Sequence, residues 1–256
     1  TGPMQISPIQ VARRLPLVSV IIPIRNRADL LRTCITGLCA TDYPAIEIII
    51  ADNDSNDAET LAYLGELAQR GITVLPQPGP FNYSRINNNA VAIAKGELIC
   101  LLNNDIEVLS PDWLKIMASQ ALRPEVGAVG AQLLYPDGRI QHAGVVLGIG
   151  GWAGHAHKGF SLYAHGYVGR ASLASNFSAV TGACMAVQKK HFDQVGGFDE
   201  VNLKVACNDV DLCLKFIEMG LRNLFTPHAL LFHHESATRG YEDTPEKKAR
   251  FQSEVA

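Results

Sequence analysis

The sequence contains no apolar run long enough to cross a membrane and no block of basic residues. A membrane-spanning helix needs about 18 or more consecutive apolar residues, and no apolar segment of the 256 residues reaches that length. The 22 lysines and arginines are outnumbered by 25 aspartates and glutamates, and they form no stripe that would track a phosphate backbone. We therefore expect a soluble globular protein that does not bind nucleic acid.

Two further signatures are missing. The six cysteines show no paired spacing of the kind that marks zinc sites or redox motifs, and they stand singly in apolar segments, at Cys34, Cys39, Cys100, Cys184, Cys207 and Cys213. We expect reduced, mostly buried thiols and, in the absence of a secretion signal, a cytoplasmic location. The glycine-rich loop GxxxxGK[ST] is also absent, which argues against a P-loop enzyme.

Strand and helix patterns alternate from residue 18 to about residue 124. The β-branched run at 18–24 predicts a buried strand. Further strands are expected at 46–51, 72–75 and 98–102, helices at 57–69 and 84–95, and another helix opened by Ser110-Pro111. Strands that are buried on both faces and separated by helices favour a mostly parallel sheet, so the expected fold class is α/β.

After about residue 125 the pattern changes to strand, turn and strand. The sequence Tyr135-Pro136-Asp137-Gly138 is typical of a turn. A helix is expected at 208–219, and two short strands follow it, ending at His233-His234. We interpret this half as a mixed layer appended to the parallel sheet.

Polar clusters follow three of the expected strands, at 23–27, 52–55 and 103–105. Parallel strands place their carboxyl ends at one edge, and α/β sheets bind ligands there, so we expect the clusters to converge. One Asp or Asn after a strand is more often a turn or capping residue. The hypothesis of a functional site therefore depends on the three clusters together.

Asp105 and Asp209 are the carboxylates best suited to chemistry. A hard divalent cation takes one or two carboxylates together with phosphate oxygens, and Asp105 suits that role. A metal there would stabilise a departing pyrophosphate. Asp209 opens the helix expected at 208–219, where it is either a charge on the helix dipole or a general base for an attacking hydroxyl. The sequence leaves both interpretations of Asp209 open.

Six short motifs occur in one order along the chain: Val18-Ser19-Val20-Ile21-Ile22-Pro23, the Asp52 cluster, Leu102-Asn103-Asn104-Asp105, Gly196-Gly197-Phe198-Asp199-Glu200, Asn208-Asp209-Val210-Asp211 and His233-His234. This ordered set resembles the family-two glycosyltransferases, which have the GT-A fold. More narrowly, it resembles the rhamnosyltransferase-like enzymes of bacterial O-antigen and polysaccharide synthesis. The resemblance covers about residues 17–240. It implies that a sugar moves from a dTDP- or UDP-sugar to a hydroxyl of a glycan or lipid-linked glycan, with inversion.

The resemblance also assigns roles to matching positions. Asp209 corresponds to the general base, and Asp105 with His233 would hold Mn²⁺ or Mg²⁺, since some relatives complete the metal site with a histidine about two dozen residues beyond the base. Asp52 would contact the donor base in a nucleotide pocket formed by Pro23, Arg25, Arg27, Asp52, Asn87, Asn103 and Asn104. His234 and Trp152 are further candidates, the tryptophan as a stacking platform for a sugar in an acceptor-side lid.

Two positions depart from the family pattern. Asn103 replaces the usual first Asp of the DxD metal motif, and Asn208 replaces the usual Glu before the base. A binding module for nucleotide sugars or glycans that has lost turnover therefore stays open as an alternative. A sugar-1-phosphate nucleotidyltransferase is a second alternative, although such enzymes carry a Gly-rich, Arg-containing loop where this chain has Ile24-Arg25-Asn26-Arg27.

Residues 141–157 are rich in glycine and histidine. His155 and His157 have a spacing that a metal could use, but no carboxylate or cysteine stands near them in the sequence, so a loop is favoured.

The expected division of the chain follows from these patterns and the resemblance. We expect a linker at 1–16, a GT-A domain at 17–235 with a nucleotide-binding half at 17–124 and an acceptor half at 125–235, and a polar tail at 236–256. The tail would begin a missing segment, through which the protein would attach peripherally to the inner face of the plasma membrane.

Overall fold

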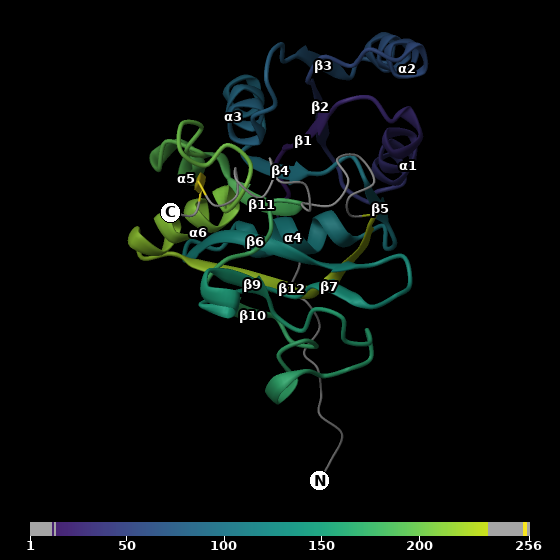
Figure 1. Cartoon of the computed structure of the whole chain (residues 1–256). Coiled ribbons are helices and arrows are strands. Elements are labelled where there is room, and N and C mark those ends of the chain that lie inside the picture. Colours follow the sequence, from purple (N-terminus) through teal and green to yellow (C-terminus); the bar gives the residue numbers. More distant parts are fainter. Residues whose placement is uncertain (1–11, 13, 235–252, 255–256) are drawn as a thin grey trace.

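One continuous mixed sheet runs through both halves of the chain (Figure 1). The structure is a computed structural model, which describes residue 12, residues 14–234 and residues 253 and 254. Along the sheet the order is β10 (Ser175–Phe177), β12 (Arg222–His233), β6 (Val126–Leu134), β11 (Cys184–Gln188), β4 (Leu98–Leu102), β1 (Val18–Ile24), β2 (Ile46–Asp52) and β3 (Thr73–Pro76). Two short strands join it from the side, β5 (Ile106–Val108) on β12 and β7 (Ile140–His142) on β6.

The strand directions confirm an α/β fold with a mixed second part. β1 is parallel to β2 and β4, β2 is parallel to β3, and β12 is parallel to β6. β11 lies between β4 and β6 and is antiparallel to both. A strand from the second half of the sequence thus completes the centre of the sheet, and the two expected halves share one core.

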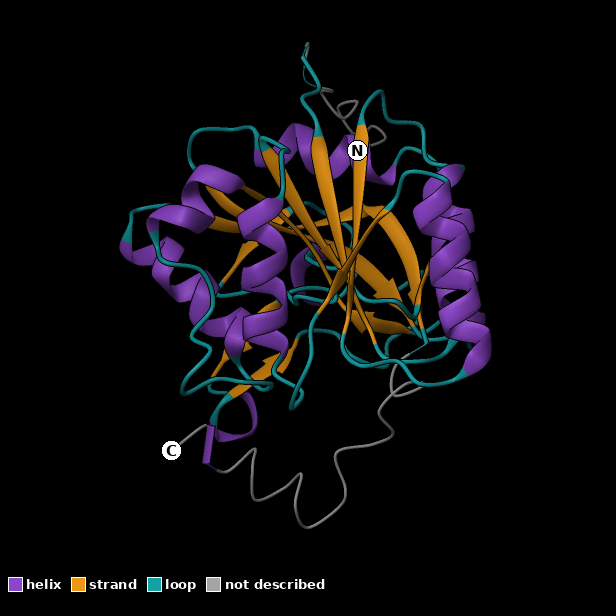
Figure 2. Cartoon of the chain, turned by 90° about the horizontal axis from the view of Figure 1, so that it is seen from above, coloured by secondary structure: helices purple, strands orange, loops and turns teal. Residues whose placement is uncertain are grey.

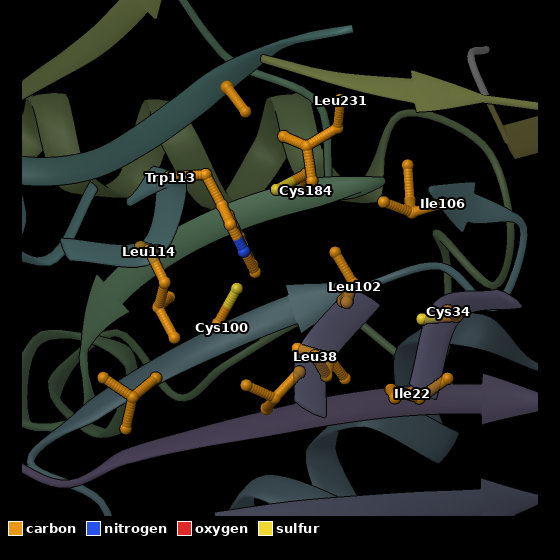
Figure 3. Close-up of a cluster of buried hydrophobic side chains, with 14 of the residues drawn as sticks. Ile22, Cys34, Leu38, Cys100, Leu102, Ile106, Trp113, Leu114, Cys184 and Leu231 are labelled. Carbon is orange, nitrogen blue, oxygen red and sulfur yellow. The ribbon is translucent and has the colours of Figure 1, made fainter. Parts of the chain in front are cut away.

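Helices cover both faces of the sheet (Figure 2). The helices α1 (Ala28–Cys39), α2 (Ala58–Gln69) and α4 (Trp113–Ala121) contribute side chains to one buried cluster. The helices α3 (Tyr83–Ile93), α5 (Lys189–Gln194) and α6 (Asn208–Glu218) contribute to the cluster on the other face. The first cluster includes Trp113 of α4, Leu38 of α1 and Leu231 of β12 (Figure 3). Burial of such apolar side chains on both faces is the main stabilisation of the sheet.

Capping side chains fix two helix starts near the carboxyl edge. Asp57 accepts a hydrogen bond from the backbone N–H of Thr60 at 2.8 Å, and Asn82 accepts one from that of Arg85 at 2.9 Å. Each satisfies a backbone donor that the helix leaves free. The expected helix at 57–69 is therefore confirmed, with Asp57 as its cap.

Two expectations for the second half were wrong. In place of two short strands after α6, the chain forms the single strand β12. Its register against β6 shifts between Thr226 and Leu230, where Pro227 has no N–H to give to the ladder, so the chain bulges and then resumes its pairing. In place of a loop, residues 145–155 contain the antiparallel pair β8 (Val145–Leu147) and β9 (Ala153–His155), connected through η1 (Ile149–Gly151).

The expected linker at 1–16 and tail at 236–256 fall largely outside the described residues. In the described part of the chain, no helix is both long and apolar enough to span a bilayer.

The six thiols are free, as the sequence predicts, and they differ in exposure. Cys34, Cys100, Cys184 and Cys213 are buried, Cys207 is half-buried and Cys39 is exposed. Burial raises the pKa of Cys34 and Cys213, so little of the reactive thiolate forms at neutral pH. We expect iodoacetamide to label Cys39 first under native conditions and the four buried thiols only after unfolding, as measured by peptide mass spectrometry. Labelling of Cys213 at the rate of Cys39 would contradict the packing described here.

Candidate active site

The first two polar clusters lie side by side at the carboxyl edge. Ile24 at the end of β1 is in register with Asp52 at the end of β2, and the N–H of Asn53 donates to the carbonyl of Ile24 at 2.8 Å. The N–H of Asn26 donates to Ser55 Oγ at 2.7 Å. The sequence prediction that these clusters converge is therefore confirmed for 23–27 and 52–55.

Most side chains of the second cluster hold neighbouring loops. Asn53 is buried, and its amide donates to the carbonyls of Gln77 at 2.7 Å and Gly79 at 3.0 Å. Asp54 accepts from the N–H of Gly79 at 2.8 Å. Asp52 accepts from the N–H of Ser55 at 3.2 Å, so one of its oxygens serves the turn. The loops after β2 and β3 are thereby fixed around Asp52.

The predicted nucleotide-pocket residues differ in their exposure. Pro23 is buried within β1, whereas Arg25 is exposed. Arg27 is half-buried and bonds to Asp29 at 2.8 Å. Its hydrogen bond with Asp29 raises the pKa of Arg27 against the opposing effect of burial, and the charge of Asp105 adds to the rise. Arg27 is therefore paired with Asp29, and its charge also interacts with that of Asp105.

Asn87 and Asn104 are both buried polar residues. The amide of Asn87 donates to the carbonyl of Tyr83 at 2.7 Å within α3, and its side-chain oxygen has no hydrogen-bond partner. The side-chain nitrogen of Asn104 also lacks a partner. An unsatisfied buried polar atom costs about 1–3 kcal/mol, so such atoms call for an explanation, and a bound ligand supplies one.

Asp105 and His233 lie together although 128 residues separate them. β5 carries the chain from Asp105 along β12, where Ile106 pairs with His233. His233 Nε2 lies 3.2 Å from Asp105 Oδ1 and 3.4 Å from Asn103 Nδ2. The backbone N–H of His234 donates to the carbonyl of Asp105 at 3.0 Å. The last polar cluster therefore meets the predicted histidine.

This pair fits a divalent cation. Asp105 is 7% exposed and its Oδ1 has no hydrogen-bond partner, although His233 stands beside it. Two adjacent ligands on an octahedral cation with bonds of about 2.1 Å lie about 3 Å apart, close to the observed 3.2 Å. Among the described residues no group of three or more His, Cys, Asp or Glu side chains gathers to hold a metal. A cation here would need further oxygens, which donor phosphates carry.

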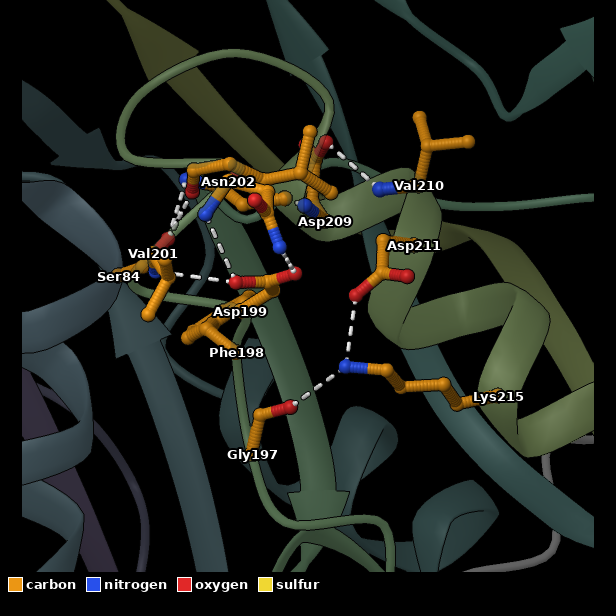
Figure 4. Close-up of polar contacts among 12 residues, drawn as sticks. Ser84, Gly197, Phe198, Asp199, Val201, Asn202, Asp209, Val210, Asp211 and Lys215 are labelled. Carbon is orange, nitrogen blue, oxygen red and sulfur yellow. Dashed lines mark hydrogen bonds and ion pairs between the residues drawn. The ribbon is translucent and has the colours of Figure 1, made fainter. Parts of the chain in front are cut away.

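Asp209 stands at the start of α6, half-buried. Its Oδ2 accepts from the N–H of Gly182 at 2.9 Å. Its Oδ1 accepts from the N–H of Val210 at 2.9 Å (Figure 4). The hydroxyl of Tyr83 donates to the carbonyl of Gly182 at 3.0 Å. A Cβ at Gly182 would lie 3.2 Å from the Tyr83 hydroxyl and 3.5 Å from the Cβ of Asp209, so a larger residue there would have to shift one of them slightly. These contacts orient Asp209 through backbone amides.

Residues 182 and 183 connect Asp209 with the metal motif. The N–H of Gly182 donates to Asp209, and the carbonyl of Ala183 accepts from the N–H of Asn103 at 2.9 Å. Consecutive residues thus contact the start of α6 and the turn that carries Asp105. The structure brings Asp105, His233 and Asp209 to one region of the sheet edge.

Asp211, two residues further along α6, has a different role. It forms an ion pair with Lys215 at 2.8 Å, and the Lys215 ammonium also donates to the carbonyl of Gly197 at 3.3 Å (Figure 4). In the same loop, Asp199 accepts from the N–H groups of Val201 and Asn202. Both carboxylates therefore stabilise the loop before α6.

The departure at Asn208 has a structural reason. Asn208 is buried, and its amide donates to Ser84 Oγ at 3.2 Å and to the carbonyl of Val205 at 3.3 Å. Its Oδ1 lies 2.8 Å from the N–H of Asp209. A carboxylate could not donate either of the first two hydrogen bonds.

Helix α3 holds the loop that precedes α6. The amide of Asn82 donates to the carbonyl of Glu200 at 2.9 Å. Asn88 bonds Phe198 twice, donating to its carbonyl at 2.9 Å and accepting from its N–H at 3.0 Å. The Ser84 hydroxyl donates to the carbonyl of Leu203. These side chains tie the approach to Asp209 to a helix from the first half of the chain.

The two further candidates contact other groups. His234 Nε2 lies 2.9 Å from Glu107 Oε2, so that histidine faces away from the Asp105 pair. Trp152 is half exposed at the end of η1. In β9, which follows Trp152, the Nδ1 atom of His155 lies 3.2 Å from Nδ1 of the buried His142. Burial lowers the pKa of His142, and the neighbouring His155 and His233 lower it further.

A cavity of about 340 Å³ lies elsewhere, lined by residues that include Arg123, Val126 and Arg222. Val126 and Arg222 are the first residues of the parallel strands β6 and β12. The cavity is therefore at the end of the sheet opposite His233 and does not contain the candidate site.

Polar clusters and the Asp105–His233 pair thus lie at the carboxyl edge of an α/β sheet, where such sheets bind ligands. Residues 19–196 match the model of the protein family that is described as Glycosyl transferase family 2. The chain belongs to this family.

Three relatives extend the comparison. An uncharacterized protein of Sinorhizobium fredii is 51% identical over 94% of this chain and 27% of its own length. The O-antigen biosynthesis protein RfbC of Myxococcus xanthus is 43% identical over 96% of this chain and 19% of its own length. The N-acetylglucosaminyl-diphospho-decaprenol L-rhamnosyltransferase of Mycobacterium tuberculosis is 24% identical over 84% of this chain and 74% of its own length. The chain thus spans about a quarter or less of the first two relatives.

Solved structures show the GT-A fold. A mannosyltransferase of Pyrobaculum calidifontis in complex with GDP-Man and Mn²⁺ has a TM-score of 0.67 and 20% identity, over 97% of this chain and 66% of that one. GalNAc-T7 with UDP, GalNAc and Mn²⁺ has a TM-score of 0.69 and 17% identity, over 87% and 44%. The predicted fold class is confirmed.

Proposed function

We propose that this domain transfers a sugar from a dTDP- or UDP-sugar to a hydroxyl of a glycan or lipid-linked glycan, with inversion, in the synthesis of a bacterial O-antigen or related surface polysaccharide. The observation that carries the proposal is that consecutive residues connect Asp209 with the Asp105 turn, since Gly182 donates to Asp209 and Ala183 accepts from Asn103, while Asp105 lies 3.2 Å from His233. The similarity to an O-antigen biosynthesis protein supports the proposed pathway. The similarity to a rhamnosyltransferase favours rhamnose as the transferred sugar.

In this proposal Asp105 and His233 would hold Mn²⁺ or Mg²⁺ for the donor diphosphate. The structural neighbours with nucleotide ligands and Mn²⁺ support a divalent cation. When bound, the cation would stabilise the negative charge that develops on the departing diphosphate. Arg27 adds a positive charge on the nucleotide side, within reach of Asp105.

Asp209 acts on the acceptor. In a single displacement, the acceptor oxygen bonds to the anomeric carbon while the bond to the diphosphate breaks on the opposite face, which inverts the configuration. The acceptor proton goes to the carboxylate of Asp209. Asp209 suits this step because its described contacts are backbone amides, whereas Asp211 is neutralised by Lys215.

A thermal-shift screen tests the donor side of the proposal. A nucleoside diphosphate that binds only the folded state raises the unfolding midpoint. We propose that UDP or dTDP with Mn²⁺ gives a larger rise than either component alone. Slow, metal-dependent hydrolysis of the matching nucleotide sugar then distinguishes an enzyme from a binding module, which would show none.

Replacement of Asp52 tests the nucleotide pocket. We expect Asp52→Ala to weaken nucleoside diphosphate binding by about tenfold or less, since one hydrogen bond to a neutral partner contributes about 0.5–1.5 kcal/mol. The loss should be equal with and without Mn²⁺, because the proposed partner is the base. Calorimetry measures both affinities. Asp54→Ala is the comparison, since it loosens the same loop at Gly79 but leaves Asp52 in place; an equal loss in both variants, or unchanged affinity in Asp52→Ala, would remove Asp52 from the pocket.

A further inference from the structure

The two ring nitrogens of His233 have different partners. Nε2 faces Asp105 and Asn103, at 3.2 and 3.4 Å, whereas Nδ1 lies 2.7 Å from Oε1 of Gln141. Gln141 is 3% exposed and His233 is 9% exposed, so water competes little for this contact. No sequence motif marks Gln141, and the proposed mechanism does not use it.

We propose that Gln141 is a positioning residue that fixes the tautomer and ring orientation of His233 for binding a divalent cation. A histidine binds a metal through a nitrogen lone pair, and the hydrogen bond at the other nitrogen decides which tautomer is present. If Nε2 presents its lone pair beside Asp105, the proton is on Nδ1. The amide oxygen of Gln141 is the acceptor for that proton.

The backbone around Gln141 is itself held in place. Its strand β7 pairs with β6, and Ile140 accepts from the N–H of Gly159 at 2.7 Å and donates to the carbonyl of Phe160 at 2.8 Å. The carbonyl of Gln141 lies 3.1 Å from His155 Nδ1. Because Gln141 is carried by this fixed strand, its side chain cannot easily follow a rotated His233 ring, and it therefore restricts the orientation of that ring. Loss of a residue that hydrogen-bonds to a metal ligand typically lowers metal affinity by about 10–100-fold.

The inference rests on the proposed function, since it takes His233 as a metal ligand, and it is tested by metal binding. The full 256-residue chain is titrated with Mn²⁺ at saturating UDP or dTDP, and free Mn²⁺ is measured by electron paramagnetic resonance. We expect Gln141→Met, which keeps the size but removes the acceptor, to weaken Mn²⁺ binding by about tenfold or more. Gln141→Glu keeps an acceptor and should bind Mn²⁺ at least as tightly as the unmodified protein.

A matched control separates positioning from general damage. Gln188 is also a buried glutamine, and its amide donates to the carbonyl of Ala121 at 2.7 Å. It is the last residue of β11 and pairs with Leu98, the first residue of β4, at the opposite end of the sheet from the site. Gln188→Met removes one buried hydrogen bond there and should leave Mn²⁺ affinity unchanged, while thermal unfolding reports the stability of each variant.

The outcomes are distinct. Weak binding in Gln141→Met with recovery in Gln141→Glu supports the inference. An equal loss in both, or in Gln188→Met, overturns it in favour of a structural role. His233→Ala is run alongside: if it weakens binding while Gln141→Met does not, the inference alone is wrong, and if it has no effect, the metal assignment of the proposed function is wrong and the inference falls with it.

Discussion

Replacing Asp209 by asparagine is expected to lower turnover by about 100-fold or more and to leave donor binding nearly unchanged. Asparagine has the same size and keeps an oxygen that can accept from the N–H of Gly182, but it cannot take the acceptor proton. Initial rates of transfer and the donor affinity of the same preparation measure the two effects.

A purely structural Asp209 would give the opposite result. Asparagine caps helices about as well as aspartate, so the variant would lose only several tenths of a kcal/mol of dipole interaction and stay active. Asp211→Asn is the matched control on the same helix. It removes the charge that pairs with Lys215 and should cost about 0.3–0.5 kcal/mol of stability, with transfer retained. Full activity of Asp209→Asn would overturn the proposed mechanism.

Replacing Asp105 by alanine is expected to abolish the gain in nucleoside diphosphate affinity that Mn²⁺ provides. The carboxylate is the only charged oxygen that this chain is proposed to give to the cation, so its removal leaves His233 and the phosphates. The fold should persist, because the hydrogen bond with His234 uses the backbone carbonyl of residue 105. Calorimetry of UDP and dTDP with and without Mn²⁺ measures the change.

Glu107→Ala is the control for Asp105→Ala. Glu107 lies two residues along in β5, pairs with His234, and its side chain is 41% exposed. Its removal deletes an acidic group two residues after Asp105 without touching the Asp105–His233 pair. Mn²⁺ dependence should persist in this variant. If Asp105→Ala also retained the full dependence, the cation would bind elsewhere.

Strands that lie within the buried sheet were well predicted from the sequence, because burial on both faces leaves a continuous apolar signal. β1 and β4 have the predicted bounds, and β2 extends one residue further, to Asp52. β12 was missed as one strand because Pro227 and the bulge around it interrupt the pattern, while pairing with β6 on both sides of the bulge keeps the strand whole. Local periodicity does not contain that tertiary pairing.

The candidate site was predictable where charge and position in a motif coincide. Asp105, Asp209 and His233 are polar residues at strand or helix ends, and the structure brings them to one edge. Gln141 and Gly182 carried no comparable signal. Gln141 contacts His233, which lies 92 residues further along the sequence, so no local pattern connects the two. Gly182 contacts Asp209 through its backbone N–H, a group that every residue except proline possesses. Contacts of these two kinds become visible only in the folded chain.

The hydrogen bonds from α3 and its cap residue to the loop before α6 limit how segments of related chains can be combined into chimeras. Asn82, Ser84 and Asn88 precede residue 125, yet their partners Glu200, Leu203 and Phe198 lie after it. A chimera cut between residues 124 and 125 would pair this loop with a foreign α3, and it would also pair β11 with a foreign β4. The two parts of the chain are therefore not independent units. A transplanted segment 125–234 would need the three α3 side chains to keep its hydrogen bonds.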